Sequence, residues 1–165
     1  MDESEIGSAP STAAVGTKPA SPLDEAPVKG RGSVRIALAS NTDGMIDGHF
    51  GSCAWFEIFD VSREAIVPIA KRVTAALGTS PAMDGEKTGQ RLALVRDCDI
   101  LGVQSIGGPP AARVVNAGIM PLKFPRSRPG AEVLQELQHR LHHPPPWLLR
   151  AMGVARSNHP QEPTP

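Results

Sequence analysis

A short stretch in the second half of the chain constrains the fold more than any other. Two apolar runs, residues 100–106 and 119–124, flank a glycine–proline turn at 107–110 and a short helical segment at 111–116. Proline suits the first turn of a helix, and glycine, here Gly118, suits the position after its end. The stretch therefore predicts a compact βαβ unit whose two strands are parallel and whose crossover is right-handed.

Alternating apolar residues predict three more strands before this unit. Residues 34–38 alternate apolar side chains with Arg35, which is typical of a half-buried strand. Residues 55–61 are aromatic and β-branched, and residues 65–71 are expected to form their hairpin partner. Pro68 indicates that this partner is an edge strand, because proline cannot donate a hydrogen bond to a second neighbour.

Two further helices are expected from apolar residues at helical spacing. The first spans residues 84–97, with Asp84 as its N-cap, and the second follows the apolar positions from Val133 to Leu141. Trp147 and the two leucines after it are expected to fasten the end of the chain onto the body.

Composition sets the domain boundaries. Every aromatic residue lies between Phe50 and Trp147, and the periodic apolar pattern begins at Val34, so one α/β domain is expected over residues 33–153. Residues 1–32 and 154–165 are rich in proline and small residues, and we expect both to be disordered tails.

Charge and cysteine content exclude several classes of protein. The 17 basic residues balance the 17 acidic ones, so no overall field attracts nucleic acid or an anionic membrane. Two cysteines do not make a disulfide scaffold, and no apolar run approaches the roughly 20 residues of a membrane helix. We therefore expect a cytoplasmic protein with free thiols.

The loop at residues 47–53 is the first candidate for chemistry. It places His49 and Cys53 four residues apart, so an imidazole and a soft thiol could face one metal if the turn folds back. The flanking glycines would let the backbone approach a bulky ligand. Histidine next to Phe50 can equally be a packing residue, and cysteine a small buried apolar one, so both interpretations stay open.

A second candidate is the start of the helix in the βαβ unit. Gly107 and Gly108 precede the helix, whose N-terminal dipole favours anions, so this turn could cradle a negative charge. Arg113 and Lys123 follow and could extend the positive field. A tight turn that serves packing alone explains the glycines equally well.

The remaining chemistry-bearing residues do not form a catalytic set. Cys98 lies between two aspartates, which raise a thiol pKa, so it is interpreted as structural. The histidines at 139, 142 and 143 precede three prolines and are expected to be solvated. No pattern of a nucleophilic triad or a zinc protease occurs, and we predict that the protein is not an enzyme.

Several motifs in order carry a resemblance to a known family. They are Gly48-His49-Phe50-Gly51-Ser52-Cys53, Ser105-Ile106-Gly107-Gly108, Ala111-Ala112-Arg113-Val114-Val115, Gly118-Ile119, Pro121-Leu122-Lys123 and Pro144-Pro145-Pro146-Trp147-Leu148. Together they resemble the nitrogenase iron-molybdenum cofactor carrier family of the NifX/NifY type, which is related to the C-terminal domain of NifB. The resemblance covers about residues 33–153.

This resemblance implies a ribonuclease-H-like three-layer α/β fold, with a mixed sheet of about five strands and flanking helices. It implies a non-catalytic protein that carries the iron-molybdenum cofactor, or its iron-sulfur precursor, during cofactor assembly and insertion into dinitrogenase. Its partners would be cofactor-free dinitrogenase and cofactor-assembly proteins. His49 matches the motif histidine as the metal ligand, with Cys53 as a second contact. The residues expected to contact the cofactor are His49, Cys53, Gly48, Phe50, Gly51, Gly107, Gly108, Arg113 and Lys123.

The chain departs from the family pattern at two places. Relatives often have histidine before the proline that matches Pro121, where this chain has Met120. The acidic stretch of relatives is reduced here to Gly85-Glu86-Lys87. It is therefore an open question whether position 120 supplies a ligand and what role the loop at 85–87 has.

Two other functions remain under consideration. The chain could be a chaperone-like protein that binds cofactor-free dinitrogenase without holding the cluster, through the 144–147 segment, Arg126 and Arg128. A nuclease-type enzyme, suggested by the implied fold alone, is the weakest candidate, because the chain shows no convergent carboxylates for two metal ions.

Overall fold

A mixed five-stranded sheet forms the middle layer of the molecule. The computed structural model describes residues 27–74 and 84–153. The elements are β1 (Val34–Ser40), β2 (Met45–Ile46), β3 (Trp55–Val61), β4 (Ile66–Val73), α1 (Asp84–Leu94), β5 (Ile100–Val103), α2 (Gly108–Asn116), β6 (Met120–Lys123), β7 (Arg128–Pro129), α3 (Gly130–Arg140) and α4 (Pro146–Ala151).

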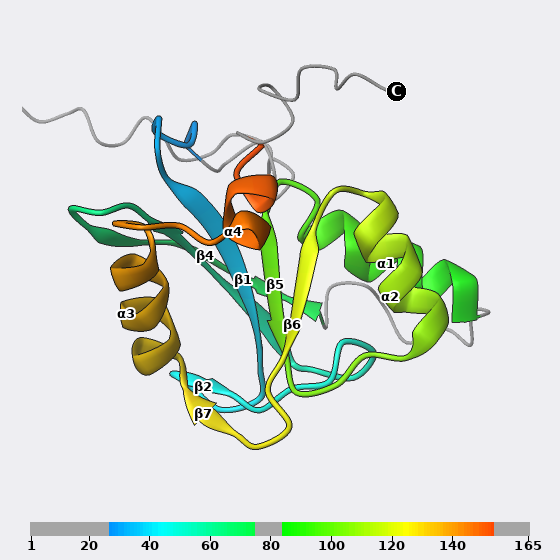
Figure 1. Cartoon of the computed structure of the whole chain (residues 1–165). Helices are drawn as coiled ribbons and strands as arrows, with labels where there is room; N and C mark the ends of the chain where they lie inside the picture. The colour runs from blue at the N-terminus through cyan, green and yellow to red at the C-terminus, as the bar shows by residue number, and fades with distance from the viewer. Residues whose placement is uncertain (1–26, 75–83, 154–165) are drawn as a thin grey trace, which may run out of the picture.

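The strand order in the main sheet is β4-β3-β1-β5-β6. Strand β3 is antiparallel to both of its neighbours, whereas β1, β5 and β6 are parallel to one another. Helices α1 and α2 cover one face of the sheet, and α3 and α4 lie on the other (Figure 1). The expected α/β architecture with a five-stranded mixed sheet and flanking helices is confirmed.

Strand β1 is buried on both faces. Ala37 and Ala39 pack into the cluster under α1 and α2, while Val34, Ile36 and Leu38 pack into the cluster under α3 and α4. The prediction of a half-buried strand is therefore wrong. A central strand with helices on both sides has no solvent face, and its small alanines fit under one layer and its larger side chains under the other.

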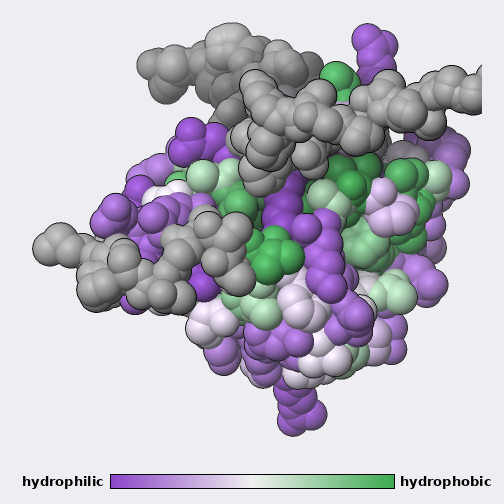
Figure 2. Space-filling model, turned by 180° about the vertical axis from the view of Figure 1, so that it is seen from behind, coloured by the Kyte–Doolittle hydropathy of each residue, from purple (hydrophilic) through white to green (hydrophobic). Residues whose placement is uncertain are grey.

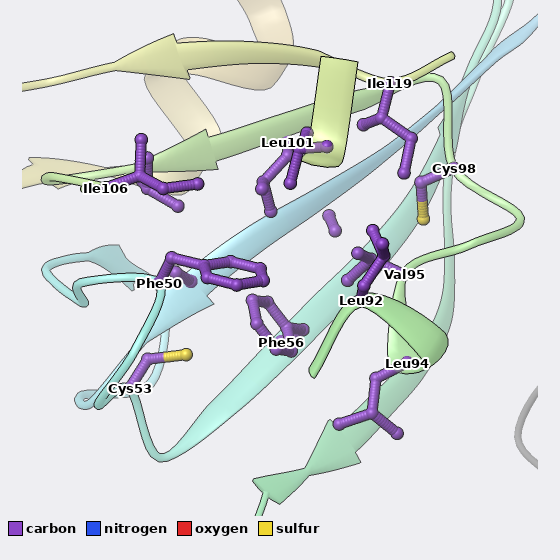
Figure 3. Packing of buried hydrophobic residues seen from close by; sticks show 14 of the residues in the cluster. Phe50, Cys53, Phe56, Leu92, Leu94, Val95, Cys98, Leu101, Ile106 and Ile119 are labelled. Atoms are coloured by element: carbon purple, nitrogen blue, oxygen red, sulfur yellow. The ribbon is translucent and has the colours of Figure 1, made fainter. Parts of the chain in front are cut away.

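The cluster under α1 and α2 contains the aromatic pair Phe50 and Phe56, whose ring centroids lie 6.0 Å apart. Both rings are buried, and Leu92 of α1 and Val95, which follows that helix, lie near Phe56 in the same cluster (Figure 3). Because Phe50 belongs to the 47–53 loop, this packing ties the candidate loop to the core.

Arg35, also in β1, can be buried because ion pairs compensate for the lost hydration of its guanidinium group. Its guanidinium donates to Asp60 at 2.6 and 2.8 Å and to Asp97 at 3.0 Å. Asp97 also accepts two hydrogen bonds from Arg72 of β4, at 2.7 and 3.0 Å. Burial on its own would raise the pKa of Asp97, but the hydrogen bonds and charges of Arg72 and Arg35 outweigh it and lower that pKa.

The βαβ unit that the sequence predicts is confirmed. Strands β5 and β6 pair in parallel, with Ile100 opposite Met120, and α2 connects them. Gly118, at φ +87°, makes the turn after the helix. The first strand is shorter than expected and ends at Val103, and beyond it Ser105 forms an isolated bridge with His49.

The hairpin of β3 and β4 is also confirmed, and β4 is an edge strand as Pro68 indicates. The register shifts between Ile58 and Phe59, opposite the residue that follows Pro68. A bulge of this kind bends the edge strand and disturbs its outer row of hydrogen-bonding groups.

Three short elements were not predicted. Strands β2 and β7 form a separate two-stranded sheet, and α4 spans Pro146–Ala151. Two-residue strands are too short to show a period, and the prolines at 144–146 suggested a loop. The expectation that Trp147 and the leucines after it fasten the chain end is confirmed, because Leu148 of α4 is fully buried in the cluster under α3 and α4.

The predicted tails lie largely outside the described residues: 1–26 and 154–165 are not described. Residues 27–32 are described, and there the carbonyl oxygen of Pro27 accepts a hydrogen bond from Arg35 while Lys29 pairs with Asp99. In the described ranges no helix combines the length and apolar character needed to cross a membrane. From behind, hydrophobic residues lie in separate groups among hydrophilic ones (Figure 2).

Candidate functional site

The 47–53 loop is fixed to the carboxyl ends of β1 and β5. The backbone N–H of Gly48 donates to Ala39, and the carbonyl of Gly48 accepts from Gln104. The N–H of Phe50 donates to the carbonyl of Ser105 at 3.0 Å. Loops at the carboxyl ends of parallel strands are the usual ligand-binding positions of α/β sheets, so the loop has both a rigid support and a typical location.

Gly48 is needed for this close approach of the loop to β1. A Cβ atom at this position would lie 2.5 Å from the Cβ of Cys53 and 3.0 Å from the backbone carbon of Ala39. Gly51 differs, because a Cβ there would meet nothing within 4 Å. The two glycines of the motif therefore have different roles. Gly48 is required by packing, and Gly51 leaves the surface open.

His49 is exposed, whereas Phe50 beside it is buried. The Nδ1 atom of His49 lies 2.6 Å from the Oγ atom of Ser105. For Nε2, the described part of the chain provides no hydrogen-bond partner. If Nδ1 carries the proton and donates it to Ser105, Nε2 presents a lone pair to the solvent, which is the arrangement of a metal-binding histidine.

Cys53 points away from that surface. Its side chain is 1% exposed, and its sulfur is directed into the cluster that contains Phe56 (Figure 3). Burial raises the pKa of Cys53 to about 11, against the opposing charge and hydrogen bond of Arg91. The thiol is therefore protonated near neutral pH, and the structure does not bring it together with His49 on one surface.

A pocket of about 410 Å³ lies next to the His49 loop. Its lining combines apolar and cationic side chains from the loop, α1 and the start of α2: Phe50, Gly51, Lys87, Thr88, Arg91, Pro109, Pro110 and Arg113. Among the described residues that line it, the pocket has three cations and no carboxylate, which favours anions over cations.

Arg91 connects the pocket to the loop. Its Nη1 atom donates to the carbonyl oxygens of Phe50 and Cys53, each at 3.2 Å, and lies 3.6 Å from the Cys53 sulfur. The guanidinium therefore holds both ends of the turn that follows His49.

The start of α2 provides fewer backbone donors than a helix usually does. Pro109 and Pro110 carry no N–H group, and the N–H of Ala111 donates to the carbonyl of Gly107. Only Gly107 and Gly108 can offer backbone N–H groups at this turn. The positive charge of the site therefore comes chiefly from side chains, and less from the helix terminus that the sequence suggested.

Lys123 lies apart from Arg113. It lines a groove of about 370 Å³ between β6 and α3, which also includes Trp147. The structure thus brings together Phe50, Gly51 and Arg113 around the pocket. Gly107 and Gly108 directly precede Pro109 and Pro110 of the lining, and Lys123 lies elsewhere.

Sequence reasoning missed Lys87, Arg91 and Ser105. Lys87 and Arg91 are four residues apart on α1 and so share a helix face, which the sequence does show. Which loop that face meets is decided by packing with Phe50, far away in the chain. Ser105 belongs to one of the motifs that carry the resemblance, but its contact with His49, 56 residues away in the chain, is set by the fold.

The other candidate residues are consistent with the sequence-based interpretation. Cys98 is buried, and burial followed by the charge of Asp97 raises its pKa well above the usual value, which supports a structural role. His139, His142 and His143 are exposed. Within the described ranges, no three histidine, cysteine or acidic side chains gather closely enough to hold a metal ion by themselves.

These features define a class: an α/β protein that displays one histidine beside a cationic pocket at the carboxyl edge of a mixed sheet. Comparison with known proteins identifies the group within this class. The chain belongs to the dinitrogenase iron-molybdenum cofactor family, whose model matches residues 32–140. The resemblance noted from the sequence motifs is thereby confirmed.

Individual relatives agree with this assignment. The chain is 42% identical to Protein NifY of Azotobacter vinelandii over 124 residues, which are 74% of this chain and 49% of that protein. It therefore spans about half the length of this relative. It is 31% identical to Protein NifX of Sinorhizobium fredii over 137 residues, which cover 80% of this chain and 86% of that one.

A solved structure shares the fold. The crystal structure of PH0822 matches with a TM-score of 0.50 and 16% sequence identity, covering 64% of this chain and 90% of that one. At this identity the likeness supports the fold alone.

Proposed function

We propose that the protein is a non-catalytic carrier of the iron-molybdenum cofactor, or of its iron-sulfur precursor, during cofactor assembly and insertion into dinitrogenase. The observation that carries the proposal is the exposed His49 ring, held by Ser105 through one nitrogen and open to solvent at the other. Membership of the dinitrogenase iron-molybdenum cofactor family supports the choice of this cofactor as the cargo.

A single imidazole suits a carrier. Neutral imidazole is a common ligand for iron, and hydrogen bonding of Nδ1 to Ser105 fixes the ring in one orientation. One protein ligand, supplemented by the charge of the adjacent pocket, gives an affinity that a receiving protein can exceed. A closed set of four ligands would retain the cluster.

In this conformation Cys53 supports the loop and does not ligate. Its sulfur lies in the core, and its carbonyl oxygen holds Arg91. Met120, where relatives often have histidine, is half-buried against the cluster under α3 and α4, so His49 has no second strong ligand from that position.

The proposal includes the wider setting. We assign the sheet, whose strand order places the one antiparallel strand beside the central β1, to the ribonuclease-H-like three-layer type. We propose a cytoplasmic location and, as partners, cofactor-free dinitrogenase and cofactor-assembly proteins, without nucleic acid or membrane.

The test is anaerobic titration of isolated cofactor into the wild-type protein and three variants. His49→Ala should weaken binding at least tenfold, since it removes the ligand. Ser105→Ala should weaken it less, because the ring keeps its nitrogen but loses its orientation. Cys53→Ala should bind nearly as well as the wild type. Equal affinity of His49→Ala and wild type would exclude the mechanism.

Two of the residues that suggested the chaperone-like alternative, Trp147 and Arg128, make contacts within the chain, whereas Arg126 is exposed. Trp147 packs half-buried against the cluster under α3 and α4. Arg128 donates to Glu136 at 2.8 Å and lies over the Phe124 ring. These side chains are used within the chain.

A further inference from the structure

Two histidines at the end of α3 form a pair that the proposed function does not use. His139 lies in the last turn of the helix, and the N–H of His142 donates to the carbonyl of His139 at 3.2 Å, so the backbone continues to turn between them. Both side chains are exposed, and their ring centroids are 6.4 Å apart. Helix α3 packs on the face of the sheet opposite α1 and α2, away from the pocket beside His49 (Figure 1).

We infer that His139 and His142 together bind a borderline divalent cation such as Zn²⁺ or Ni²⁺, as a two-ligand site whose other coordination positions are taken by water. Neutral imidazole is a ligand that suits these ions. The inference is independent of the proposed function, because it involves neither His49 nor the cargo.

The spacing of the two rings suits one shared ion. Residues three apart on a helix lie on the same side of it. Metal–nitrogen bonds of about 2.1 Å place the centres of two imidazoles on one ion roughly 4.5–6.5 Å apart, depending on the angle between the bonds. The observed 6.4 Å lies at the upper end of this range. Because both side chains are exposed, rotation about their own bonds can bring the ring nitrogens closer without moving the helix.

The surroundings of the pair contribute charge of both signs. The last carbonyl groups of a helix carry partial negative charge, which favours a cation at this end of α3. Arg140 follows His139 and opposes a cation, but Glu132 and Glu136 line the same surface hollow as these two residues. Glu136 accepts a hydrogen bond from Arg128 at 2.8 Å, so it balances charge and is not counted as a ligand.

Two protein ligands make an open site. In the described parts of the chain, no group of three histidine, cysteine or acidic side chains is close enough to hold an ion. An ion on two imidazoles and water exchanges more readily than one in a closed structural site with four protein ligands. Hard cations such as Mg²⁺ prefer oxygen ligands and should not occupy the pair.

The experiment is a calorimetric titration of Zn²⁺ into the untagged, metal-free full-length protein. We expect one saturable site per chain and no competition from Mg²⁺ at equal concentration. In a parallel NMR titration, the ring signals of His139 and His142 should shift together and saturate at the same ratio of Zn²⁺ to protein.

The variants remove one imidazole at a time. His139→Ala and His142→Ala should each weaken Zn²⁺ binding at least about tenfold, because only one ligand of the pair remains. His143→Ala is the matched control and should leave the affinity unchanged. His143 is exposed and follows His142 directly, but in the described part of the chain its ring contacts neither member of the pair. Because all three side chains are exposed, each variant should keep the urea midpoint of the wild type.

Wild-type affinity for Zn²⁺ in both His139→Ala and His142→Ala would overturn the inference, and so would a His143→Ala effect as large as theirs. His49→Ala should bind Zn²⁺ like the wild type. Loss of Zn²⁺ binding in His49→Ala alone would place the ion at His49, which contradicts the inference and leaves the carrier proposal standing. Conversely, unchanged cofactor affinity in His49→Ala would exclude the carrier mechanism without altering Zn²⁺ binding at the pair, so the two proposals fail separately.

Discussion

At the scale of single residues, adjacent side chains of the 47–53 loop point to opposite environments, one to solvent and one to the core. His49 is exposed, while Phe50 is 1% exposed and anchors the loop in the core. Gly48 allows the backbone to lie against Ala39 and Cys53. The imidazole is therefore presented by a segment that is fixed on either side, and a fixed ligand loses less conformational freedom on binding.

Gly48→Ala should destabilise the protein. Its new Cβ would lie 2.5 Å from the Cβ of Cys53 and 3.0 Å from backbone of Ala39, neither of which can move like a flexible side-chain end. We expect the free energy of unfolding to fall by about 1–3 kcal/mol, as for other overpacked sites. Urea denaturation measures the loss.

Gly51→Ala is the matched control, because a Cβ at Gly51 has open space around it. Its free energy of unfolding should stay within about 0.5 kcal/mol of the wild type. Equal stability of the two variants would show that the close approach at Gly48 does not constrain the loop.

At the scale of secondary-structure elements, the carboxyl ends and the amino ends of the parallel strands have different roles. The carboxyl ends of β1 and β5 carry the His49 loop and the pocket. Near the amino ends of these strands lies Asp97, which joins β1 to β4 through ion pairs with Arg35 and Arg72. Because these two guanidinium groups are almost completely buried, their counter-charge at Asp97 has a large effect on stability.

Asp97→Asn should lower the free energy of unfolding by about 3 kcal/mol at pH 7, since it leaves buried guanidinium charge without its carboxylate. The wild-type pKa of Asp97 is lowered, so its contribution is complete above the ordinary value near 3.8 and is lost as the pH falls through the lowered value. The difference between the two proteins should therefore shrink at acid pH.

Chemical denaturation from pH 7 to pH 3 measures that convergence. Asp43→Asn is the control, because Asp43 forms an exposed ion pair with Lys71 and its loss should cost less than about 1 kcal/mol. A constant difference across this range would contradict the assignment of the lowered pKa to Asp97.

The sequence predicts elements that depend on neighbours in the chain and misses those that depend on distant contacts. The βαβ unit and the β3–β4 hairpin follow from local apolar periods and turn residues. Burial of Arg35 depends on Asp97, which is 62 residues away. In the same way, the sequence motif singles out His49 as a candidate site residue. That Lys87 and Arg91 line the pocket beside it depends on where α1 packs.

At the scale of the whole molecule, prolines limit pairing at both edges of the main sheet. Pro68 lies in edge strand β4, and Pro121 lies in edge strand β6. Neither residue can donate a backbone hydrogen bond to a further strand, which discourages edge-to-edge association. The helices cover both faces, so the loops at the carboxyl edge are the natural place for a ligand.

The last prediction concerns the N-terminal boundary of the domain. A fragment of residues 27–153 should unfold at the same denaturant concentration as the full chain. A fragment of residues 33–153 should be less stable by about 1–2 kcal/mol, because it loses the Pro27 carbonyl that accepts from Arg35 and the Lys29 partner of Asp99. Lys29→Ala in the full chain isolates the ion pair and should account for less than half of that loss, since Lys29 is partly exposed. Equal stability of the two fragments would place the boundary at residue 33, as the composition suggested, and would show that the contacts of residues 27–32 do not stabilise the fold.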